Sequence, residues 1–174
     1  MKDFRIYIMV FVIACVAPLS VAGEDFFVEE SLTPIVPSAI QAIKKYESRS
    51  GNIFRCVLHG KFVDLAGAGN PADLVVTTKN ACQWAASAGP VWVLRNEGDK
   101  FTVVLKFVTY NLEIMKEKSN GLRNIKTSRG TAGSAEVEFW AYSGRMYKKT
   151  ASYYFSSDDE VKCKAHPDIC PFEF

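Results

Sequence analysis

The chain has 174 residues, of which 48% are hydrophobic and 13% aromatic, and it carries 21 Lys and Arg against 19 Asp and Glu. This length fits one globular domain, and the composition excludes a collagen-like or globally disordered chain. A formal net charge of +2 argues against a nucleic-acid-binding protein, which has a basic stripe and a high pI. With only two histidines, a histidine-rich metalloenzyme is also excluded.

The first 22 residues have the pattern of an export signal. Lys2 and Arg5 precede an apolar run over residues 6–17, and Ser20 and Ala22 are the small residues that a signal peptidase requires. The run is shorter than the roughly 20 residues that span a membrane. We therefore predict cleavage after Ala22 and a periplasmic or secreted protein that is not integral to the membrane after cleavage.

A second interpretation of this segment uses Cys15. Residues 12–15, VIAC, resemble the lipobox of bacterial lipoproteins, in which the cysteine is acylated and becomes the first residue of the mature protein. The apolar run continues beyond Cys15 to the small residues before Gly23, which favours ordinary cleavage over a lipid anchor. Both interpretations place the domain outside the cytoplasm.

The mature chain is expected to begin with an irregular lead over residues 23–37, followed by a single α+β domain over residues 38–174. Ser38 is a suitable N-cap for a helix that runs to about residue 49. The positions of this helix expected to face water are Gln41, Lys44, Lys45 and Glu47.

After the helix, apolar and β-branched runs separated by turn residues predict antiparallel strands. The candidate strands are residues 53–65, 74–78, 91–95, 100–108, 112–116, 122–127, 135–142 and 145–155, with a glycine-rich loop at residues 129–133. This spacing predicts an α+β fold in which one N-terminal helix packs on an antiparallel β-sheet or sandwich of about seven to nine short strands.

Alternation along the strands predicts which side chains share a face. In residues 135–142, Glu136 and Glu138 are expected to face away from the apolar side, and Trp92 is expected in the core. One strand is expected to present four apolar residues on a single face, namely Phe101, Val103, Leu105 and Phe107.

Four cysteines follow residue 22, an even number that indicates two disulfides in an exported protein. Cys163 and Cys170 enclose six residues, including Pro167, so closing that loop costs little chain entropy. We therefore predict Cys163–Cys170 together with Cys56–Cys82, the second joining two strands of one sheet.

A zinc site is the alternative, because His59 and His166 each follow a cysteine in a C-x-x-H sequence. On a strand, however, positions i and i+3 face opposite sides, and an oxidising compartment converts thiols to disulfides. We therefore predict no metal site.

No sequence motif supports a catalytic site. Residues 67–72, GAGNPA, match a dinucleotide-binding string, but a strand follows instead of the required helix, so a turn is expected. Asp158, Asp159 and Glu160, with Asp168 nearby, lack the spacing of an EF-hand loop and are expected to form a solvated turn rather than a calcium site. We therefore predict a protein that is not an enzyme and uses no cofactor.

Two tryptophans and a group of cations are candidates for a binding surface. Trp84 lies in the small-residue loop over residues 80–89, and Trp140 lies on the polar side of its strand. The cations suit an anionic polymer or an acidic protein surface; they are Lys116, Lys118, Arg123, Lys126 and Arg129.

Two turn-and-aromatic patterns resemble hairpins of small exported bacterial β-rich proteins. The patterns are NGLRNI at residues 120–125 and WAYSGRMY at residues 140–147. Some proteins of this size and build inhibit cell-wall hydrolases, so the resemblance implies an inhibitor or immunity protein.

The C-terminal sequence CKAHPDIC, residues 163–170, resembles the disulfide-closed C-K-P-H-D-C loop of inhibitor-of-vertebrate-lysozyme proteins. In that family the loop places a histidine and an aspartate in the active cleft of lysozyme. The resemblance implies that His166 and Asp168, with Lys164 beside them, contact an enzyme.

These features lead to two main functional hypotheses. The first is an exported, non-catalytic protein that binds and inhibits a cell-wall-degrading enzyme, either a lysozyme or a secreted toxin, so that its partner is a peptidoglycan hydrolase. The alternative is an envelope or secreted binding module for a polymer or protein, which uses Trp84, Trp140 and the cations. A hydrolase with a pair of carboxylates is least supported, because the sequence identifies no pair.

Overall fold

The computed structural model describes residues 24–27, 32–51, 53–85 and 88–173. The export signal at residues 1–22 and Cys15 lie outside the described residues.

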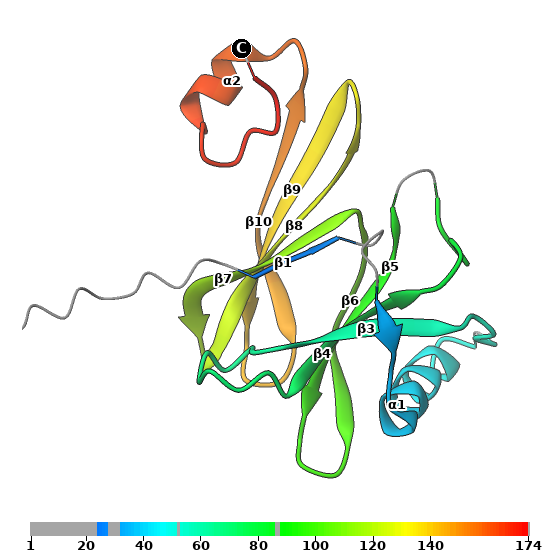
Figure 1. Ribbon diagram of the computed structural model, residues 1–174. Coiled ribbons are helices and arrows are strands. Elements are labelled where there is room, and N and C mark those ends of the chain that lie inside the picture. Colours follow the sequence, from blue (N-terminus) through cyan, green and yellow to red (C-terminus); the bar gives the residue numbers. More distant parts are fainter. Residues whose placement is uncertain (1–23, 28–31, 52, 86–87, 174) are drawn as a thin grey trace, which may run out of the picture.

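The described residues form ten strands, paired in two antiparallel sheets, and two helices (Figure 1). We call the first sheet the long sheet; its strands, in spatial order, are β1 (Glu24–Phe27), β7 (Asn111–Ser119), β8 (Leu122–Thr131), β9 (Ser134–Tyr142) and β10 (Tyr147–Ser156). We call the second sheet the covered sheet; its strands are β2 (Thr33–Pro34), β3 (Leu58–Val63), β4 (Asp73–Thr78), β5 (Gly89–Asn96) and β6 (Phe101–Thr109). The helices are α1 (Pro37–Ser48) and α2 (Glu160–Ala165).

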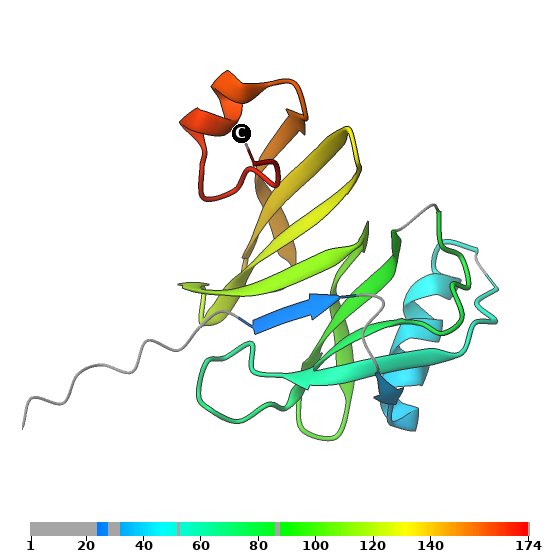
Figure 2. The same cartoon turned by 45° about the horizontal axis from the view of Figure 1, so that its top comes forward.

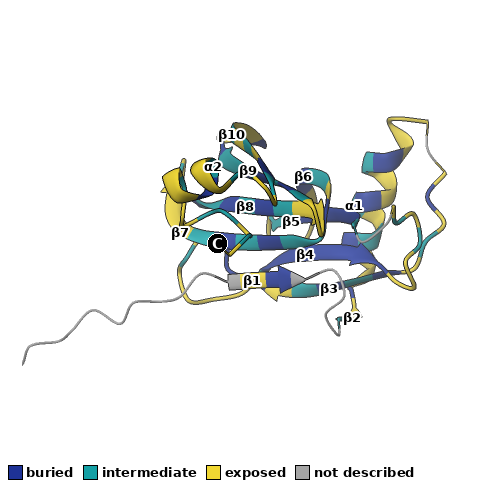
Figure 3. Ribbon diagram, turned by 90° about the horizontal axis from the view of Figure 1, so that it is seen from above, coloured by how far each residue is buried: buried dark blue, intermediate teal, exposed yellow. Residues whose placement is uncertain are grey.

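The main core lies between the two sheets. Its buried side chains include Phe26, Leu112, Ile114 and Ile125 of the long sheet and Val75, Val91, Val93 and Leu105 of the covered sheet. The opposite face of the covered sheet packs against α1, where Ala39 and Ile43 join a second core cluster around Trp92. β4 is therefore buried along its whole length, as Figure 3 shows. The architecture is a β-sandwich with a helix on one outer face.

The helical elements differ from the prediction in number and position. Val36, not Ser38, is the N-cap of α1, and Pro37 occupies its first turn, where the missing N–H of proline costs no hydrogen bond. The segment expected to be irregular contains β1 and β2, so α1 is not N-terminal. The helix α2, which follows β10, was not predicted.

The strands agree with the prediction in order, but their bounds shift, most of all at β3 and β8, and the described residues form ten of them instead of seven to nine. β3 begins only at Leu58, so residues 53–57 are not part of a strand. β8 continues to Thr131 through the expected glycine-rich loop, which leaves Ala132 and Gly133 as the hairpin turn.

The prediction that the four apolar residues of β6 share one face is wrong, because the strand carries a β-bulge. Val93 pairs with Leu105 while the next residue, Leu94, pairs with Val103, so Val104 is an extra residue on β6. One added residue inverts the faces that follow it. Phe101 and Val103 consequently pack below α1, whereas Leu105 and Phe107 face the long sheet, as the cluster memberships show.

Glu47 was expected to face water but is buried, with 3% of its surface exposed. Its carboxylate accepts hydrogen bonds from Trp92 Nε1 at 2.9 Å and from Lys106 Nζ at 2.8 Å. A buried carboxylate is tolerated when it is paired and hydrogen-bonded in this way. Glu47 therefore connects the last turn of α1 to β5 and to the edge strand β6 of the covered sheet.

Candidate binding site

The C-terminal segment, residues 157–173, packs on the outer face of the long sheet, away from the covered sheet. Val137 and Phe155 of the sheet form a third apolar cluster with Cys163 and Phe172. Val137 alternates along β9 with Glu136 and Glu138, which lie on the inner face. Figures 1 and 2 show α2 and the C-terminus together at one end of the molecule, far from α1.

The predicted disulfide pairing is confirmed. Cys163–Cys170 closes the C-terminal loop with Cα atoms 5.1 Å apart, and Cys56–Cys82 joins Cα atoms 5.9 Å apart. Cys56 and Cys82 lie in the loops flanking β3 and β4 rather than within strands. Within the described residues no group of three or more His, Cys, Asp or Glu side chains is placed to hold a metal ion.

Hydrogen bonds give the C-terminal loop a defined shape. Asp159 caps α2 by accepting the N–H of Lys162 at 3.0 Å. The carbonyl of His166 accepts the N–H groups of Ile169 at 3.2 Å and Cys170 at 3.0 Å. The disulfide and these bonds together hold the loop in one conformation.

The predicted acidic turn before this loop begins the helix. Asp159 is the N-cap of α2, and Asp158 accepts a hydrogen bond from the Ser156 hydroxyl. Both carboxylates thus serve local structure.

The three predicted contact residues of the loop lie in different environments. The His166 ring is half-buried, with its centroid 5.0 Å from that of Tyr153 and 6.4 Å from that of Phe155. Lys164 and Asp168 are exposed, and Lys164 forms an ion pair with Glu160. His166 therefore packs the loop onto the sheet, while Asp168 and Lys164 are presented to solvent.

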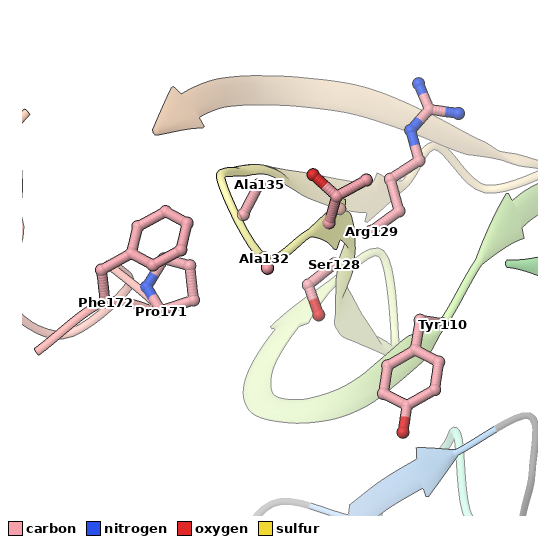
Figure 4. A pocket seen from close by; sticks show the side chains of 9 residues that line it. Tyr110, Ser128, Arg129, Ala132, Ala135, Pro171 and Phe172 are labelled. Atoms are coloured by element: carbon pink, nitrogen blue, oxygen red, sulfur yellow. The ribbon is translucent and has the colours of Figure 1, made fainter. Parts of the chain in front are cut away.

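A pocket of about 490 Å³ adjoins this loop (Figure 4). Pro171 and Phe172 form one side, and Tyr110 with the end of the β8–β9 hairpin forms the other. A smaller hollow of about 170 Å³ lies beside the loop and shares Phe172 with the first. The sequence contains no signal that brings Tyr110 to Phe172, because they meet only through tertiary structure.

Trp84 and Trp140 do not join the C-terminal loop. Both are half-buried against the inter-sheet core, which lies on the other face of the long sheet. The Trp140 ring stacks with Phe107 at 6.1 Å, and Lys149 Nζ lies over it at 5.6 Å. A Cβ atom on Gly89 would lie 2.5 Å from Trp84 Nε1, so that ring rests directly on the β5 backbone.

The predicted cations lie on two neighbouring strands of the long sheet, Lys116 and Lys118 on β7 and Arg123, Lys126 and Arg129 on β8. Lys126 forms an ion pair with Glu113, and Arg129 forms one with Glu136. Lys126 and Arg129 are an odd number of residues apart on β8, so their side chains extend from opposite faces. Within the described part of the chain these cations do not make one continuous basic surface.

The glycine-rich string at residues 67–72 is a turn followed by β4, as predicted. Gly67 and Gly69 have positive φ angles of 62° and 81°. The N–H groups of Ala68 and Gly69 donate to the Asp64 carboxylate at 3.1 and 2.6 Å. The turn therefore binds a carboxylate of its own chain, in the place where a dinucleotide-binding turn would bind phosphate.

The pKa values of Asp64 and its neighbour Asp73 shift in opposite directions. Burial by itself would raise the pKa of Asp64, but the N–H groups of Gly69, Ala68 and Gly67 outweigh it and lower the pKa. Burial raises the pKa of Asp73 above its usual value despite hydrogen bonds from Asn96 and Leu65. Ionised Asp64 thus stabilises the fold, whereas ionised Asp73 costs stability.

We expect Asp64→Asn to lower the free energy of unfolding by about 1–3 kcal/mol at pH 7, because its amide group faces backbone donors. Since the folded-state pKa of Asp64 is lowered, its contribution is present above the unfolded pKa and is lost as the pH falls through the folded pKa. Urea unfolding at pH 7 and at about pH 3 should show the difference from the wild type shrinking in acid. A difference that grows in acid would contradict this role.

Comparison with protein-family models, curated proteins and solved structures finds no match to this chain. Neither helix among the described residues has the length and apolar character needed to cross a membrane. The two disulfides fit an oxidising compartment such as the periplasm or the extracellular space.

Proposed function

We propose that this chain is an exported, non-catalytic protein that binds and inhibits a cell-wall-degrading enzyme, a lysozyme or a secreted toxin. The observation that carries this proposal is the C-terminal loop, closed by Cys163–Cys170 and packed onto the long sheet through His166. A loop already held in one conformation loses little entropy on binding. Its exposed Asp168 and Lys164 are polar groups of the kind that meet catalytic side chains in an enzyme cleft.

His166 and Asp168 have separate roles in this proposal. His166 fixes the loop against Tyr153 and Phe155, and Asp168 makes the polar contact with the enzyme. Pro171 and Phe172, which directly follow the closed loop in sequence, line a pocket that supplies a place for an apolar side chain of the partner. An apolar pocket beside fixed polar groups is the usual composition of an interface centre.

The test is inhibition of a panel of lysozymes and cell-wall amidases by the purified mature protein, in its oxidised form and after reduction. We expect the oxidised protein to inhibit at least one enzyme and reduction to weaken inhibition. His166→Ala combined with Asp168→Ala should weaken inhibition by about 100-fold, a typical loss for central interface residues. Asp99→Ala, in the exposed β5–β6 turn, is the matched control and should inhibit like the wild type.

Circular dichroism of each variant separates loss of contact from loss of fold. Inhibition of no member of the panel would contradict the proposal. So would a folded double variant that inhibits as well as the wild type.

A further inference from the structure

A second pocket, of about 260 Å³, lies on the inner face of the long sheet, opposite the face that carries the C-terminal loop. Arg129, Glu136 and Tyr154 line it from β8, β9 and β10. Arg129 pairs with Glu136 and Glu136 with Tyr154 in the sheet register, so the three side chains stand in a row across neighbouring strands. Ala85 and Ala88 of the β4–β5 loop line the other side.

This pocket lies beyond the apolar core of the sandwich. Nearer the middle of the sheet, the same inner face carries Ile125 and Trp140, which pack against the covered sheet. Farther along, the side chains change to an ion pair, hydroxyl groups and one exposed aromatic ring. The small side chains of Ala85 and Ala88 leave space in front of them.

The ion pair is fixed in orientation and still has hydrogen-bonding capacity. Arg129 Nε and Nη2 donate to Glu136 Oε2 at 3.0 and 2.7 Å, and Ser152 Oγ donates to Glu136 Oε1 at 3.1 Å. A guanidinium has five N–H donors and a carboxylate about four acceptor positions. The hydrogen bond from Arg129 lowers the pKa of Glu136, so the carboxylate is ionised at neutral pH.

Tyr154 supplies an exposed aromatic ring, with 59% of its surface accessible. It differs in this respect from Trp140, whose ring is stacked on Phe107. A tyrosine offers an apolar ring face and a hydroxyl that both donates and accepts. Thr131 and Ser134, at the end of the β8–β9 hairpin, add two further hydroxyls to the lining.

We propose that this inner pocket binds a neutral saccharide. The positive charge of Arg129 and the negative charge of Glu136 offset each other, so the pocket does not favour a strongly charged ligand. Adjacent donors and acceptors match the hydroxyl groups of a sugar, and the ring of Tyr154 matches an apolar sugar face. The volume is slightly below the range of pockets for drug-sized ligands and suits one or two sugar rings.

The test is titration of the ¹⁵N-labelled protein with N-acetylglucosamine, its trimer, glucose and maltotriose, followed by NMR. We expect saturable shifts for at least one saccharide, centred on the amides of Ala85, Ala88, Arg129, Glu136 and Tyr154. Tyr154→Ala and Arg129→Gln should each weaken binding by about tenfold or more, while Lys148→Ala, on the outer face of β10, should bind like the wild type. Absence of saturable shifts with all four saccharides would overturn the proposal, as would unchanged binding by a folded Tyr154→Ala variant.

The inner pocket and the pocket beside Phe172 both include the end of the β8–β9 hairpin, since Arg129, Gly130, Thr131 and Ala135 line both, so Arg129→Gln does not separate the two proposals. Tyr154 lines only the inner pocket of the two and does separate them. Tyr154 lies on the other face of the long sheet from His166 and Asp168, so Tyr154→Ala should leave enzyme inhibition unchanged. Loss of saccharide binding with inhibition retained would therefore be the expected behaviour of that variant.

Discussion

Replacement of Glu47 by alanine is expected to lower the free energy of unfolding by about 3 kcal/mol, because the substitution removes one partner of a buried charged pair. Trp92 Nε1, which is fully buried, would lose its acceptor, and Lys106 Nζ would lose the carboxylate 2.8 Å away. An unsatisfied buried donor and an unpaired, half-buried cation both cost free energy. Urea-induced unfolding at neutral pH measures the loss.

Two further variants of α1 make this experiment specific. Glu47→Gln keeps an acceptor for Trp92 but removes the charge opposite Lys106, so we expect a smaller loss of about 1 kcal/mol. Lys44→Ala changes an exposed position of the same helix and should change stability by less than about 0.5 kcal/mol. If Glu47→Ala unfolds at the same urea concentration as Lys44→Ala, the carboxylate does not hold α1 to the sheet.

Removal of the Cys56–Cys82 disulfide by a double alanine substitution is expected to destabilise the protein by about 3.5 kcal/mol. Without the bridge the unfolded chain has more conformational entropy, which favours unfolding. The residues are 26 apart in sequence. Cys56 also packs against the core below α1, so both this packing and the bridge hold its loop in place. Thermal unfolding should show a midpoint lower by roughly 10 °C for a chain of this size.

The Cys163–Cys170 bridge provides the matched comparison. Its residues are only seven apart, and the same relation gives about 2.5 kcal/mol. If the C-terminal loop is the inhibitory element, its removal should weaken inhibition more than removal of the first bridge, even though it costs less stability. Equal losses of inhibition in the two variants, at temperatures where both are folded, would contradict that order.

Several features of this chain follow from local sequence. The short Cys163–Cys170 spacing and the even number of cysteines after residue 22 predicted both disulfides, because closing a short loop costs little entropy. The turn at residues 67–72 was predictable because the residues after it favour a strand. Trp92 was assigned correctly to the core, where its exposed fraction is 0%.

Other features depend on partners distant in sequence. The bulge at Val104 inverts part of β6 without a local signal, since neither Gly nor Pro marks it. Glu47 has a polar position in the helical pattern and is buried only because Trp92 and Lys106 supply hydrogen bonds from the covered sheet. β1 is short and becomes a strand by pairing with β7, more than 80 residues later.

The same division applies to the candidate sites. Local sequence determined the closed C-terminal loop and the alternation that puts Glu136 and Val137 on opposite faces of β9. Tertiary structure decided that the His166 ring packs on Tyr153, that Trp140 is stacked on Phe107, and that Tyr154 remains exposed. The physical reason is that turn formation, loop closure and strand alternation are properties of neighbouring residues, whereas burial and pocket formation depend on which strands the fold brings face to face.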